Sequence, residues 1–177
     1  MDLKMKIWIL AILAAAILAV YAVPTFYEAG TQRKVIRVAR TMAEDLMQAR
    51  FQSLSGSDNN GIRLVRTGRQ AYTIFSGDKV IKTAYLDQTD PTVVYSSLLD
   101  TKGAVIEKDS FIFKTVRNIN EPATKGHDSI FFNDKTSEEK GSLKNIIRLY
   151  IDKDTYNIKL FRVYEVKDNG DLVFKEI

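Results

Sequence analysis

The chain has 177 residues, of which 45% are hydrophobic and 27% charged, with a formal net charge of +4. These contents are ordinary for a folded protein, and the roughly 150 residues outside one apolar segment suffice for a single domain with its own core. The chain has no cysteine, which excludes disulfides and thiolate chemistry. The mild positive charge suits an anionic surface but does not demand one.

The first segment of the chain, residues 7–23, is apolar and carries no charge. As a helix with ~1.5 Å rise per residue it spans ~25 Å, at the short end of what crosses a bilayer. Trp8 and Tyr21 lie near its ends, where amphipathic rings favour the membrane interface. We therefore expect a retained membrane anchor. A cleaved secretory signal, preceded by Lys4 and Lys6, and a buried core helix are the alternatives.

Four basic residues follow this segment: Arg33, Lys34, Arg37 and Arg40. By the positive-inside rule alone they would place the C-terminal part of the chain in the cytoplasm. They are also the candidate contact with lipid headgroups or nucleic acid. Lipid is the better match, because neither interleaved aromatic residues nor a recognition helix accompanies the cluster.

An amphipathic helix is predicted to continue from Thr25 to Ser55, after a kink at Pro24, which removes a backbone donor. Its apolar residues recur at steps of three and four: Val35, Val38, Ala39, Met42, Leu46 and Ala49. This stripe predicts packing on the following sheet, although the upper part could instead pack on other copies or partners. A second apolar edge contains Ile36, Ala43, Met47 and Leu54. Glu44 and Asp45 are expected among the solvated charges, and Gly56 ends the helix.

The rest of the chain shows short alternating runs separated by turn signals, which predict antiparallel strands. The expected strands are residues 62–67, 70–75, 79–86, 92–95, 111–116, 129–133, 145–151, 156–166 and 172–175. Residues 117–128 and 135–142 read as loops, the second polar and turn-rich. The predicted fold class is α+β, a long helix packed on one antiparallel sheet. We divide the chain into residues 1–24, the transmembrane half of the helix, 25–56, its amphipathic half, and 57–177, a β-rich head.

No pattern in the sequence predicts catalysis, a cofactor or a metal site. His127, the only histidine, is expected in a surface loop with nothing to orient it. The pairs Asp152/Asp154 and Asp168/Asp171 lack the remaining ligands and spacing of a calcium loop and are better explained as hairpin turns. We therefore predict that the chain is not an enzyme and takes no small-molecule substrate.

The layout resembles type IV pilins and pseudopilins, and locally the GspH/FimT family of minor pseudopilins. The resemblance is carried by residues 22–26 (AVPTF), residues 37–50 (RVARTMAEDLMQAR), the strand 62–65 and the hairpin formed by 146–150 and 156–164. Two features differ from the family: no glycine precedes the apolar segment, and Ile7 stands where the family has a glutamate. Whether the N-terminus is processed is therefore left open.

The resemblance implies a subunit of a type II secretion or type IV pilus system, at or near the tip of the filament. It would be a single-pass protein of the cell inner membrane, with the head outside the cytoplasm and other pilin or pseudopilin subunits as partners. The alternatives are a DNA-binding minor pilin for DNA uptake and a membrane-anchored domain unrelated to pilins. The sequence does not distinguish secretion from pilus assembly and does not name the partners.

Overall fold

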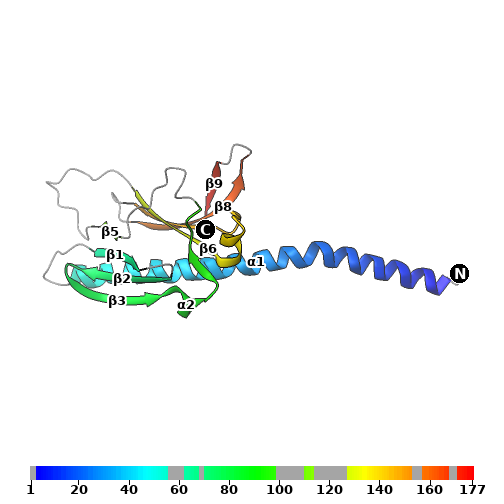
Figure 1. Ribbon diagram of the computed structural model, residues 1–177, viewed down its shortest axis with the longest axis horizontal. Coiled ribbons are helices and arrows are strands. Elements are labelled where there is room, and N and C mark those ends of the chain that lie inside the picture. Colours follow the sequence, from blue (N-terminus) through cyan, green and yellow to red (C-terminus); the bar gives the residue numbers. More distant parts are fainter. Residues whose placement is uncertain are drawn as a thin grey trace.

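The computed structural model describes residues 3–55, 62–67, 70–98, 110–113, 127–152, 157–167 and 171–177. It opens with one long helix, α1 (Leu3–Ser55), and all strands follow it (Figure 1). The predicted α+β class, a long N-terminal helix followed by antiparallel strands, is therefore confirmed. The helix continues through Pro24 without interruption, and α1 ends one residue before Gly56.

The strands described form two antiparallel sheets rather than the single sheet predicted. The four-stranded sheet has the order β3-β2-β1-β5, with β1 (Ile62–Thr67), β2 (Ala71–Ser76), β3 (Lys79–Tyr85) and β5 (Ser110–Phe113). The five-stranded sheet has the order β4-β6-β7-β8-β9, with β4 (Val93–Tyr95), β6 (His127–Asp134), β7 (Ile147–Asp152), β8 (Ile158–Val166) and β9 (Leu172–Glu176). The chain changes sheets between β3 and β4, and β5 returns to pair with β1.

Two short helices were missed by the prediction. One turn of helix, α2 (Leu86–Thr89), follows β3 directly, where the predicted strand continued through Leu86. Another, α3 (Lys135–Glu139), replaces the start of the predicted polar loop 135–142. Its N-cap is Asp134, whose carboxylate accepts from the Ser137 N–H at 3.2 Å. Helices of one turn are too short to show a helical period, so periodicity cannot find them.

The core lies where the C-terminal half of α1 packs on strands of both sheets (Figure 1). Alternate residues of β7 show how the five-stranded sheet contributes: Ile147, Leu149 and Ile151 are buried, whereas Arg148 and Tyr150 between them are partly exposed. This period of two places one face of the strand on the core. From the four-stranded sheet, Ile62, Leu64, Tyr72 and Ile74 join the same cluster.

The loop prediction for His127 is wrong. His127 is the first residue of β6, where it pairs with Asp152 and stacks on the Tyr150 ring at a centroid distance of 4.8 Å. The predicted loop extended too far because this end of the strand is polar. The turns predicted at 56–61, 68–69, 153–155 and 168–170 and the loop 117–126 lie outside the described residues.

Candidate functional site

The N-terminal half of α1 projects away from both sheets (Figure 1). The large apolar side chains described on it are exposed: Trp8, Ile12, Leu13, Ile17, Phe26 and Tyr27. Trp8 is 71% exposed and Phe26 is 77% exposed. Burial of one such side chain is favourable by roughly 1.5–3 kcal/mol of free energy, so burial of all of them together is strongly favourable. Exposed apolar surface of this extent marks a contact with lipid or with protein.

Across the part of the chain that the structure describes, no helix combines the length and apolarity needed to cross a membrane. Within the predicted span 7–23, the side chains described are those of Trp8 and of residues 12–17. The membrane span therefore stays a prediction from the sequence.

The six residues predicted to pack α1 on a sheet are all buried: Val35, Val38, Ala39, Met42, Leu46 and Ala49. They contribute to one core that α1 shares with both sheets. On the second predicted edge, Ala43 is buried and Ile36 packs partly against the core, whereas Met47 is 42% exposed. The side chain of Leu54 lies outside the described residues.

The four basic residues after the apolar segment, Arg33, Lys34, Arg37 and Arg40, are all exposed on α1. Arg37 also has a structural contact: its Nη2 donates to Oδ2 of Asp90 at 3.0 Å and to the Thr89 carbonyl at 3.4 Å. Burial opposes ionisation of Asp90, but hydrogen bonds from Thr92 and the nearby charges of Lys34 and Arg37 hold the pKa of Asp90 below its usual value. Arg37 thus links the end of α2 to α1.

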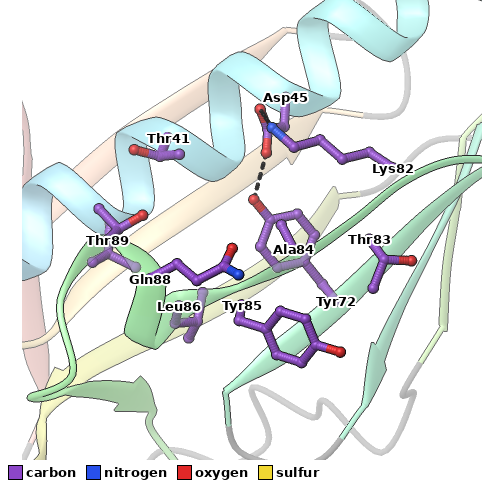
Figure 2. A pocket seen from close by; sticks show the side chains of 11 residues that line it. Thr41, Asp45, Tyr72, Lys82, Thr83, Ala84, Tyr85, Leu86, Gln88 and Thr89 are labelled. Atoms are coloured by element: carbon purple, nitrogen blue, oxygen red, sulfur yellow. Dashed lines mark hydrogen bonds and ion pairs between the residues drawn. The ribbon is translucent and has the colours of Figure 1, made fainter.

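Asp45 is not on the solvated face of α1, contrary to the prediction. It is 8% exposed, and its carboxylate accepts two short hydrogen bonds from the four-stranded sheet. The Tyr72 hydroxyl donates to Oδ2 and the Lys82 ammonium donates to Oδ1, each at 2.6 Å (Figure 2). These three residues form a polar network that joins α1 to β2 and β3. Hydrogen bonds to a charged group are the stronger kind, so this network fixes the position of the helix on the sheet.

The pKa of Tyr72 is raised well above its usual value, mainly because burial disfavours the phenolate. The hydrogen bond to Asp45 and the negative charge of that carboxylate raise it further. Tyr72 therefore remains a neutral hydrogen-bond donor, and the arrangement suits a structural contact better than acid–base chemistry.

A pocket of about 120 Å³ opens beside this network, between α1 and β3 (Figure 2). Val38 and Thr41 of α1, Ala84 of β3 and Leu86 and Gln88 of α2 line it, together with the three residues of the network. Apolar and polar groups therefore share its walls. Nothing in the sequence predicted a pocket here.

The sequence did contain one signal for Asp45. It lies three residues after Met42 and four before Ala49, so it continues the apolar stripe rather than the basic face. A charged residue within such a stripe is read as solvated unless a partner is known. Both partners are distant along the chain, 27 and 37 residues away, and no local pattern reveals them.

A second polar network joins α3 to the end of β4. Glu138 accepts hydrogen bonds from Ser96, Ser97 and Asn133 at 2.7–2.9 Å. Burial alone would raise the pKa of Glu138, but these donors favour the carboxylate and hold its pKa below the usual value. These hydrogen bonds join α3 to β6, through Asn133, and to the two residues that follow β4.

No group of His, Cys, Asp and Glu side chains within the described ranges could hold a metal ion. Comparison of the chain with protein-family models, with curated proteins and with solved structures finds no match.

Proposed function

We propose that the protein is a membrane-anchored, non-enzymatic pilin-like subunit, a minor pseudopilin that assembles through its N-terminal helix. The observation that carries the proposal is the N-terminal half of α1, which extends beyond the head (Figure 1). The large apolar side chains described on it, among them Trp8, Ile12 and Phe26, are exposed. A helix of this kind is stable only when lipid or other helices cover it.

The two halves of α1 differ in how they are buried, and this division supports an assembly role. Val35, Met42 and Leu46 are covered by the protein's own sheets, whereas Ile12, Ile17 and Phe26 are not. The same helix can therefore hold the head rigidly at one end and offer an apolar surface at the other. In a membrane that surface contacts lipid, and in a filament it contacts the helices of neighbouring subunits.

The proposal includes a place in the cell: the inner membrane, crossed once by residues 7–23, with the head outside the cytoplasm. The uncharged segment of the sequence supports the span, and the resemblance to pseudopilins supports the orientation. Long domains can cross a membrane despite flanking positive charge, so Arg33, Lys34 and Arg40 do not oppose this orientation strongly.

Replacement of Ile12, Leu13 and Ile17 by lysine tests the anchor. The full chain is expected in the membrane fraction, resistant to alkaline extraction, and the triple variant in the soluble fraction. A photo-crosslinking residue at Ile17 or Phe26 then tests assembly, with Lys144 on the head as the control position. Crosslinks to other membrane-anchored helices from α1 support the proposal, and a wild-type chain released by alkaline extraction contradicts it.

A further inference from the structure

The strand β3 lies at the edge of the four-stranded sheet, and among the described strands its neighbour is β2 alone. The N–H of Leu86 donates to the Gln70 carbonyl at 2.7 Å, just beyond the paired residues Tyr85 and Ala71. Hydrogen-bonded and non-hydrogen-bonded pairs alternate along an antiparallel ladder. Thr83 and Tyr85 therefore point their backbone groups away from β2.

This outward-facing edge is short. The register shifts between Ile74 and Phe75, which places a bulge on β3 before Lys82. At the other end Tyr85 is the N-cap of α2, so its carbonyl accepts the first bond of that helix. The backbone groups of β3 that still point outward between these two limits are the N–H and carbonyl of Thr83 and the N–H of Tyr85. They suffice for main-chain hydrogen bonds to a few residues of an added strand.

The pocket lies beside the same three residues of β3 that form this edge, Thr83 to Tyr85, and all three border it (Figure 2). Ala84 is buried and pairs with Tyr72, whose hydroxyl reaches Asp45 of α1, whereas Thr83 and Tyr85 are exposed. Successive side chains of a strand alternate between its two faces. A residue paired with Thr83 would point away from α1, and its neighbour beside Ala84 would point into the pocket.

The size and charge of the pocket limit the side chain that it accepts. Its volume is about 120 Å³, and a cavity of about 150 Å³ holds a benzene molecule, so a side chain as short as Thr, Val or Asn fits. The Asp45 carboxylate is already paired with Lys82, so a second charge would be buried without a partner. The Thr41 hydroxyl donates to the Arg37 carbonyl at 3.1 Å, which leaves its oxygen to accept from an incoming group.

A second copy of the chain fits this edge poorly. If two β3 strands paired antiparallel with Thr83 opposite Thr83, the Lys82 of each copy would lie beside Ala84 of the other. If Thr83 instead lay opposite Tyr85, the two Ala84 residues would face each other and both pockets would stay empty. A different chain avoids both problems. The exposed Lys79 favours an acidic residue near it, whereas Lys82 is already paired with Asp45.

We propose that the edge of β3 binds an extended segment of a partner protein, which adds a strand at Thr83 and Tyr85 and places one short, uncharged side chain in the pocket beside Ala84. An acidic residue lies on the Lys79 side of that position. The main-chain hydrogen bonds give affinity, and the pocket gives sequence preference. This inference does not depend on the pilin-like function proposed above.

A displayed library of random linear peptides, selected on the full chain in detergent micelles, tests the proposal. The selected peptides are expected to share a short uncharged residue with an acidic residue on one side of it. In hydrogen–deuterium exchange they should protect the amides of Thr83 and Tyr85 and leave β9, an edge of the other sheet, unchanged. Ala84→Leu fills the pocket and should weaken their binding about tenfold or more.

Two further variants keep the test decisive. Thr83→Pro removes an N–H that points away from β2, so it should weaken binding without breaking the ladder. Val80→Leu changes an exposed residue of the same strand and should leave binding unchanged. Thermal unfolding shows which variants are folded. Failure to select any peptide, protection confined to other segments, or equal affinity for a folded Ala84→Leu variant would each overturn the proposal.

Discussion

Tyr72→Phe removes one hydroxyl from the buried network around Asp45 and tests whether that network holds α1 on the sheet. Tyr72 is 2% exposed, so the phenyl ring keeps its packing and the change is confined to one hydrogen bond. A hydrogen bond to a charged group contributes about 1.5–3 kcal/mol, and the carboxylate left behind is itself buried. We expect the free energy of unfolding to fall by about 2 kcal/mol.

The assay is chemical denaturation of the full chain in detergent micelles, followed by circular dichroism. Tyr85→Phe is the matched control, because Tyr85 also lines the pocket but is 48% exposed, and it should change stability by less than about 0.5 kcal/mol. Lys82→Met completes a double-mutant cycle. Because Tyr72 and Lys82 donate to the same carboxylate, their effects should not add. Equal stability of Tyr72→Phe and the wild type would refute this account of the network.

Three further predictions use the same denaturation assay. Leu46→Asp buries a charge in the core and should lower the free energy of unfolding by about 4 kcal/mol or more, whereas Met47→Asp, at an exposed position, should lower it by less than about 1 kcal/mol. Equal losses for the two variants would contradict the burial pattern. Glu138→Gln should destabilise the protein most near neutral pH, and its difference from the wild type should shrink below about pH 4. Arg37→Met should lower the free energy of unfolding by only about 0.5–1 kcal/mol, because the guanidinium is largely exposed and water screens its attraction to Asp90. A larger loss would contradict this weak contact.

The sign of the Glu138 prediction follows from the lowered pKa of this carboxyl in the folded state. Such a group stabilises the fold above its unfolded pKa, and the contribution disappears as the pH falls through the folded pKa. A difference between wild type and Glu138→Gln that grows on acidification would contradict the hydrogen-bonded carboxylate described here.

The sequence predicted those features of the fold that depend on local periodicity. The alternation in residues 62–67 predicted β1 with its observed bounds, and the spacing of residues such as Val35, Met42 and Leu46 matches their burial in the core. These patterns are visible because each residue's environment repeats with the period of its own helix or strand.

Features that depend on distant partners could not be predicted. The strand pattern does not say that β5 pairs with β1 or that β4 begins a second sheet, since pairing is decided by packing across the whole chain. Asp45 is buried because Tyr72 and Lys82 reach it from another element. The pocket beside Ala84 results from the turn into α2, a helix too short to leave a pattern.

The central claim, a membrane-anchored helix with its head outside the cytoplasm, is tested most directly by cysteine labelling. The chain has no cysteine, so Asp78→Cys, in the exposed turn between β2 and β3, introduces a single thiol. Intact spheroplasts are treated with a membrane-impermeant maleimide, and a cytoplasmic thiol protein serves as the lysis control. The account predicts that Asp78→Cys is labelled while the cytoplasmic control is not. Labelling of the variant only after lysis would place the head in the cytoplasm and contradict the proposed function.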